Sequence, residues 1–318
     1  CRTGGLQFAL RCDLMVVEPT QVAFTIGARR LFAVERNVAT MAFTLEDALS
    51  KTLPASSAPF PAADGVRILS APLSMADEIA AGLSGHVAGA REDYRRHYIA
   101  MDASFEDYLA RFSGKTRSTL RRKTKKFAAA GGGALDVRTY RTRDEVERFL
   151  DLALPLSANT YQSRLLDAGL PDSDTARDAM LARAEAGTLR CFLLFLGAEP
   201  VAYLALPVEG RTLVYAHLGY DPAHAALSPG TVLQMEALRL LFGEERFRYF
   251  DFTEGEGAHK ALFGTHSVAC CSFLLLRRTP ANRALLGARR GFDAGVALAK
   301  SFTQQSGSLA SARRLLRA

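Results

Sequence analysis

Residues 212–233 read TLVYAHLGYDPAHAALSPGTVL. Residues 212–220 are mostly apolar, aromatic or β-branched, which predicts a β-strand, and residues 221–227 are rich in turn formers. Ser228-Pro229-Gly230 then precedes an apolar helical periodicity over 231–242, and proline is favoured in the first turn of a helix. The stretch therefore predicts a strand, a turn and a helix in series, which is a building unit of α/β folds.

The segments on both sides of this stretch continue the alternation of strands and helices. Strands are predicted at 135–140, 189–196, 200–208, 249–252 and 270–276, and helices at 144–152, 174–186 and around 259–263. Gly197-Ala198-Glu199 predicts a hairpin connection between two of the strands. This order predicts a domain over 131–276 with a mixed central sheet flanked by helices.

The first 130 residues alternate in a similar way but carry no catalytic motif of their own. Strands are predicted at 14–17, 23–26 and 66–69, and helices at 45–53 and 76–83, the first of them capped by Thr44. A basic helix follows from residue 105, capped by Ser104, and it ends at the glycines 131–133. We interpret that glycine run as a domain boundary, which predicts domains at 1–130 and 131–276 and a tail at 277–318.

The composition indicates a folded protein with an uneven distribution of charge. With 318 residues and 48% hydrophobic residues, the chain is long enough for two cores. The sequence holds no apolar run of about 18 residues and no signal-peptide pattern at its start, which predicts a cytoplasmic protein. Five cysteines without CxxC spacing predict reduced thiols.

The positive charge is concentrated in two segments. The net charge is +7, yet 108–135 holds eight Lys/Arg and no acid, and 277–318 holds nine Lys/Arg and one acid, so the rest of the chain is acidic. Such a concentration of positive charge in two segments indicates an anionic partner. The stretch 111–126 could bind RNA, but apart from Phe112 it has no aromatic residue interleaved with its basic residues for stacking on bases. This favours a phosphate or lipid-headgroup surface over RNA, with a simple solvated helix face as the alternative.

The tail has an amphipathic pattern. Leu285, Phe292, Val296, Ala299 and Phe302 approximate one face of a helix. The pattern fits either a helix lying on an anionic membrane, which would make the protein peripheral at the inner membrane surface, or a helix docked on the body of the protein itself.

The order of elements and several segments resemble the GNAT superfamily of acyltransferases, and more closely its FemAB-like and CelD-like envelope acetyltransferases. The resemblance covers about residues 95–276. It depends on the basic stretch 105–126, the triplet Thr160-Tyr161-Gln162, the strand-turn-helix 215–233, and Asp251-Phe252 followed by Lys260. The resemblance implies tandem GNAT-like domains, of which residues 1–130 are a degenerate half, and acyl-CoA or acetyl-CoA as co-substrate.

The donor site is expected at the predicted helix that follows residue 228. Free amides at a helix N-terminus bind phosphates, so Ser228, Gly230 and Thr231 are candidates for the CoA pyrophosphate, with an ordinary capped helix as the alternative. The resemblance also implies a break in strand pairing near Leu218 and Gly219, which would free an amide for the oxyanion.

The catalytic candidates follow from the need to move protons during thioester aminolysis. Glu254 is the preferred base for the amine, and Asp251 is expected to orient a neighbour. His259 can protonate the leaving thiolate or exchange roles with Glu254. His217 is a further candidate, because alternation along the predicted strand places it on the same face as Tyr215, where both would face substrate or form a satisfied core edge.

Other candidates concern the acceptor. Thr160, Tyr161 and Gln162 lie on a polar segment assigned to the acceptor pocket, and Lys260 holds a carbonyl or phosphate or is simply a surface lysine. We predict no metal site, because the six histidines never fall at ligand spacing.

Taken together, the sequence predicts an acyl-CoA-dependent N-acyltransferase. The expected acceptor is an amine on a cell-envelope glycan or an amphiphilic lipid, such as an amino sugar or a sphingoid-type base. Two alternatives stay open: an aminoacyl-tRNA-dependent transferase, and a non-catalytic envelope-assembly module.

Overall fold

The computed structural model describes residues 17–26, 29–54, 63–158, 169–255 and 257–305, except for the side chains of 300–305. The chain forms two compact units. Unit 1 combines Cys1–Arg95 with Val268–Ala318, and unit 2 is the continuous segment Arg96–Ser267. Both units hold strands and helices, so the predicted mixed α/β class is confirmed.

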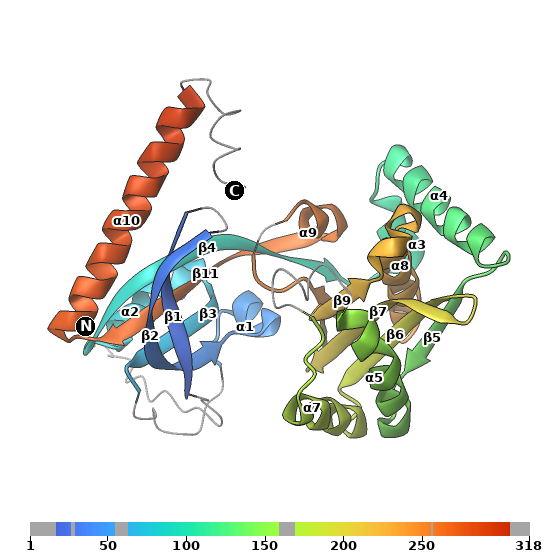
Figure 1. The fold of residues 1–318 in the computed structure, drawn as a ribbon, viewed down its shortest axis with the longest axis horizontal. Helices are drawn as coiled ribbons and strands as arrows, with labels where there is room; N and C mark the ends of the chain where they lie inside the picture. Colours follow the sequence, from blue (N-terminus) through green and yellow to red (C-terminus); the bar gives the residue numbers. More distant parts are fainter. Residues whose placement is uncertain (1–16, 27–28, 55–62, 159–168, 256, 306–318) are drawn as a thin grey trace, which may run out of the picture. The chain divides into compact units, whose positions relative to one another are not determined.

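Unit 1 is built around a mixed sheet (Figure 1). Its elements are β1 (Val17–Ile26), β2 (Arg29–Ala42), α1 (Leu45–Ser50), β3 (Gly65–Pro72), the 3₁₀ turn η1 (Leu73–Met75), α2 (Ala76–Gly82) and α10 (Pro280–Gln305), with the first part of β4 (His86–Ala100) and most of β11 (His266–Arg277). β1 pairs antiparallel with β2, β2 parallel with β3, and β3 antiparallel with β11. Thr44 caps α1 as predicted, in a capping box with Asp47.

Helix α10 docks on unit 1 through its first half. Leu285 and Leu286 are buried in one cluster with Phe24 of β1. Phe292 meets the Phe24 ring edge-on, with centroids 5.4 Å apart. Farther along, Leu298 is 58% exposed. The segment predicted as a separate tail is therefore part of unit 1, because its apolar stripe covers the β1 side of the sheet.

Unit 2 contains the elements around the quoted stretch (Figure 1). They are α3 (Phe105–Ala110), α4 (Gly114–Ala130), β5 (Asp136–Tyr140), α5 (Arg143–Ala158), α7 (Asp174–Glu185), β6 (Leu189–Leu196), β7 (Glu199–Glu209), β8 (Thr212–Val214), β9 (His217–Tyr220), η2 (Pro222–Leu227), α8 (Pro229–Phe242), β10 (Tyr249–Asp251) and α9 (Ala258–Phe263). The sheet order within the unit is β4-β10-β8-β7-β6-β5, and β9 pairs with β7.

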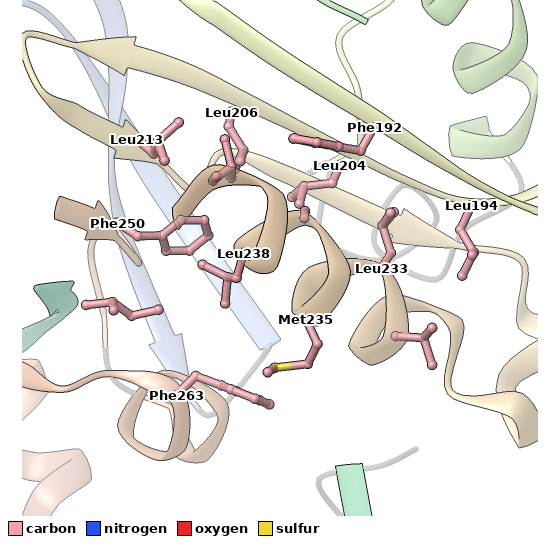
Figure 2. Packing of buried hydrophobic residues seen from close by; sticks show 14 of the residues in the cluster. Phe192, Leu194, Leu204, Leu206, Leu213, Leu233, Met235, Leu238, Phe250 and Phe263 are labelled. Carbon is pink, nitrogen blue, oxygen red and sulfur yellow. The ribbon is translucent and has the colours of Figure 1, made fainter. Parts of the chain in front are cut away.

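Helix α8 lies against one face of this sheet. Leu233 and Leu238 pack among side chains from β6, β7 and β10, including Leu204 and Phe250 (Figure 2). Helices α5 and α7 cover the other face, where Phe149 is fully buried. Burial of a large apolar side chain contributes about 1.5–3 kcal/mol, so both layers hold the sheet in place.

The division into units differs from the predicted boundary at residues 131–133. The basic helix, predicted to belong to the first domain, packs in unit 2, where Phe127 joins the core around α8. The glycines end this helix within the unit: Gly132 and Gly133 adopt positive φ, at 88° and 105°, which favours glycine. The basic helix is also two helices, because Ser113 caps α4 and interrupts the helical run after α3.

No helix among the described residues combines the length and the apolar character that crossing a bilayer requires.

Candidate functional site

The candidate site begins where β8 stops pairing with β10 and the chain continues into β9. β8 pairs parallel with β10 up to Val214 and Asp251, and the Tyr215 amide still donates to the Asp251 carbonyl over 2.9 Å. The Ala216 amide then donates back to the Val214 carbonyl over 2.9 Å, a tight turn that ends the strand. Within the described residues, β9 pairs only with β7. The predicted strand 212–220 is therefore broken at the carboxyl ends of two parallel strands, where sites in such sheets collect. We call this break in pairing the gap.

The register of β9 shows which amides face the gap. Asp221 donates to Val201 of β7 over 2.9 Å, and the same antiparallel register pairs Gly219 with Tyr203. Hydrogen-bonded positions alternate in such a pair, so the Gly219 amide points to β7 and the Leu218 amide points away from it, toward the gap. Leu218 thus offers the backbone donor that an oxyanion requires.

Gly219 serves the packing of the other face of the sheet. A Cβ on Gly219 would lie 2.4 Å from Cε1 of Tyr203, a ring that is fully buried. The Tyr203 hydroxyl is held in place by Ser157 of α5, with the oxygens 2.9 Å apart. The ring cannot retreat without losing this hydrogen bond.

We expect Gly219→Ala to lower the free energy of unfolding by about 1–3 kcal/mol, the usual cost of overpacking a core. Urea unfolding of the purified protein measures the effect. Gly114→Ala is the matched control, because a Cβ at Gly114 meets nothing within 4 Å. Equal stability of the two variants would contradict the tight approach of β9 to Tyr203.

The N-terminus of α8 has no side-chain cap and is faced by lysines, and its first two residues, Pro229 and Gly230, are buried. Ser228 adopts a left-handed conformation (φ 55°) and its side chain makes no cap hydrogen bond. Among the described residues, none accepts a hydrogen bond from the amides of Gly230 or Thr231. Lys123 of α4 reaches the Thr231 hydroxyl at 3.4 Å, and Lys126 donates to the Ala226 carbonyl over 2.9 Å. Free amides, the helix dipole and the lysines together favour an anion here.

A pocket of about 310 Å³ lies at this helix end. It is lined by Lys115, Thr116, Thr119, Leu120, Lys123, Thr231, His259, Leu262 and Phe263. The next residue toward the helix start, Gly230, is buried against β9, where a Cβ would be 3.2 Å from the side chains of Leu218 and Tyr220. We call this cavity the donor pocket.

Three polar side chains, His259, Gln234 and Tyr215, form hydrogen bonds beside the donor pocket. His259 Nε2 lies 2.8 Å from Gln234 Oε1, and the Tyr215 hydroxyl donates to the same oxygen over 3.4 Å. Gln234 is fully buried, and its Nε2 finds no partner among the described residues. With the amide in this orientation, His259 carries its proton on Nε2, which leaves Nδ1 with a lone pair.

The surroundings of His259 keep its imidazole neutral. Burial lowers the pKa of His259, and the positive charges of Lys123 and Lys260 lower it further. The ring packs against Phe263 with centroids 4.7 Å apart (Figure 2 shows Phe263 in the core). A neutral imidazole near pH 7 is suited to accept a proton. Sequence reasoning missed Gln234, although a glutamine within the apolar run of α8 was a usable signal.

The acidic residues after β10 occupy different environments. Asp251 is fully buried and held by Arg96 of β4, with Nη2 and Oδ2 2.5 Å apart. The Thr253 amide also donates to Asp251, over 2.9 Å. Glu254 is exposed, and its backbone carbonyl accepts a hydrogen bond from Lys260. Burial lowers the pKa of Lys260, partly offset by Asp251 and Glu254. Asp251 is therefore a buried residue that supports the structure around it, whereas Glu254 is in contact with solvent.

His217 lies on the opposite side of the sheet from Tyr215, so the expectation that they share a face is wrong. Tyr215 packs with Phe252, at a centroid distance of 5.4 Å, on the α8 side. His217 makes a hydrogen bond with the backbone of Gly169, on the α5 side, and burial lowers its pKa. The turn at Ala216 inserts a residue that shifts the alternation. Gly169 follows the segment of Thr160, Tyr161 and Gln162, which lies outside the described residues.

In the part of the chain that the structure describes, no three His, Cys, Asp or Glu side chains gather as metal ligands.

Comparisons with known proteins agree with the architecture of unit 2. Residues 114–261 match the family model of the acetyltransferase (GNAT) domain. The match covers slightly under half of the chain and supports the GNAT superfamily for this segment, and the chain is an enzyme of the acyltransferase class. A search of curated proteins gives no match.

Several solved structures are similar to the chain. FemX is 12% identical, with a TM-score of 0.48 over 81% of this chain and 88% of that one. The C-terminal domain of a protein described as a lysylphosphatidylglycerol synthetase, from Agrobacterium fabrum, is 13% identical, with a TM-score of 0.47 over 71% and 72%. A GCN5-related N-acetyltransferase from Kribbella flavida is 13% identical, with a TM-score of 0.36 over 68% of each chain. Similarity at this level identifies neither substrate nor donor.

Proposed function

We propose that this protein transfers an acyl group from a CoA thioester to an amine on a cell-envelope glycan or an amphiphilic lipid. The observation that carries the proposal is the parting of β9 from β10 directly beside the uncapped N-terminus of α8. A thioester can lie in the gap while its phosphates meet the helix end. The GNAT match over 114–261 supports the same reaction class.

The donor pocket suits the charged part of CoA. The amides of Gly230 and Thr231 and the ammonium of Lys123 offer donors to a pyrophosphate. Lys115, at the same pocket, adds a second positive charge. Ser228 presents its backbone at this helix end rather than a capping side chain.

The reaction forms a C–N bond and breaks a C–S bond. Glu254, which contacts solvent, takes the first proton from the ammonium form of the acceptor. As the amine nitrogen attacks, the Leu218 amide holds the oxyanion, and His259 Nδ1 accepts the second amine proton. His259 then returns that proton to the departing thiolate, so amide and free CoA thiol are the products. Tyr215 and Gln234 orient the imidazole, and His217 faces the acceptor side.

We expect Lys123→Ala to weaken CoA binding about tenfold, because one charge-assisted contact to phosphate is lost. Calorimetric titration with CoA measures this, and Arg122→Ala is the control, since Arg122 is exposed on the same helix and lines neither pocket of α4.

Release of free thiol from acetyl-CoA or longer acyl-CoA with candidate amines tests the reaction itself. A protein that shows no thermal stabilisation by CoA and binds no tRNA would be the non-catalytic module instead.

Aminoacyl-tRNA is the second candidate donor, and helix α4 is the observation that favours it. Its seven Lys/Arg make no ion pair with any acid of the described residues. Binding to RNA through such a helix falls steeply with salt concentration. If the protein bound tRNA with an affinity that falls steeply with salt and did not bind CoA, aminoacyl-tRNA would be the donor instead of acyl-CoA.

A further inference from the structure

A second cavity, distinct from the donor pocket, lies between α3, α4 and α8. Its volume is about 250 Å³. Its walls are formed by Phe105, Leu109, Leu120, Leu135, Val232 and Met235. All six side chains are apolar, so the cavity offers almost nothing to a polar ligand. We call it the apolar groove.

One rim of the apolar groove is positively charged. Arg121 and Lys125 of α4 line it, and both are exposed. Neither makes a hydrogen bond or an ion pair with another described residue. The acid at the groove, Glu236, already pairs with Arg239 at 2.5 Å. The two cations of the rim are therefore available to an external anion.

An apolar wall with unpaired cations along one side is complementary to an amphiphile with an anionic head. A chain buried in the groove leaves water, and a phosphate or carboxylate at its end meets Arg121 and Lys125. The groove has about the volume of eight water molecules, which suits part of one aliphatic chain. We propose that the apolar groove binds a single-chain amphiphile whose anionic head contacts Arg121 and Lys125.

This site is separate from the donor pocket, so the inference stands independently of the proposed function. The two cavities share only Leu120 among their lining residues. The donor pocket faces Thr231 and His259, whereas the apolar groove faces Val232 and Met235, which lie farther along α8.

Calorimetric titration of the full chain with decyl phosphate, below its micellar concentration, tests the proposal. We expect decyl phosphate to bind at least tenfold more tightly than inorganic phosphate or decyltrimethylammonium. Arg121→Glu with Lys125→Glu should weaken decyl phosphate binding at least tenfold. Arg122→Glu reverses one charge of the same helix away from the groove, against two in the double variant, and should leave the affinity unchanged.

A variant that fills the groove distinguishes the contact with the decyl chain from the contact with the charged head. Thr124 lines the groove, and Thr124→Phe should abolish decyl phosphate binding while CoA binding stays as in the original protein. Equal binding of the cationic and anionic amphiphiles would overturn the proposal, as would an equal loss with Arg122→Glu. Displacement of decyl phosphate by CoA would overturn it too, since it would make the groove part of the donor site.

Discussion

Arg96→Met should lower the free energy of unfolding by about 3–5 kcal/mol, the cost of breaking a buried ion pair on one side. Both side chains of the pair are almost completely removed from water, at 6% and 0% exposure. Without the guanidinium, Asp251 keeps the Thr253 amide as a partner, which cannot balance its charge in the interior. Such a loss is a large share of the stability of an ordinary domain, and guanidinium unfolding followed by circular dichroism measures it.

The double variant Arg96→Met with Asp251→Leu is the control for this prediction. It removes both charges, so we expect it to recover most of the stability that the single variant loses. Glu236→Gln, which breaks the exposed pair with Arg239, should cost under about 1 kcal/mol. If Arg96→Met lost no more stability than Glu236→Gln, water would reach the Arg96–Asp251 pair, and Asp251 would not be a buried support.

The elements that the sequence predicted best are those with one buried stripe or an unbroken apolar run. β6 and β7 are buried along nearly their whole length, and their limits were predicted within one residue. β2 and β4 were missed, because both carry many charged residues and expose much of their length. Pairing with neighbouring strands, which a local pattern does not reveal, makes them strands.

The candidate site was predictable where local chemistry decides it. Ser228-Pro229-Gly230 predicted the start of α8, and the short helix around His259 was also expected. The pairing of Asp251 with Arg96 joins residues 155 positions apart, which spacing cannot show. The turn at Ala216 likewise depends on where β10 stops pairing, and this long-range fact reversed the expected face of His217.

His259→Ala should lower kcat for acyl transfer by about 100- to 1,000-fold, the usual contribution of a positioned proton carrier. CoA affinity should change little, because the phosphate contacts lie at α8 and α4. His266→Ala is the matched control, as His266 is exposed in the same domain and stacks on Tyr98 instead. Thiol release under saturating donor measures kcat. A larger loss in Glu254→Gln than in His259→Ala would reassign the main base to Glu254.

The pH profile distinguishes a proton carrier from a structural residue. Since the pKa of His259 is lowered, its neutral form persists below pH 6.5, and activity should hold through pH 6.5 and fall only at lower pH. In His259→Ala the small remaining activity should lose this acidic limb. Gln234→Glu places a carboxyl group 2.8 Å from the imidazole, where it favours the imidazolium, so the limb should move to higher pH. The hydrogen bonds of the Gln234 side chain go to His259 and Tyr215, so Gln234→Glu acts on the titration of His259. A limb that stays in place in Gln234→Glu but disappears in His217→Ala would show that His217, and not His259, carries the proton.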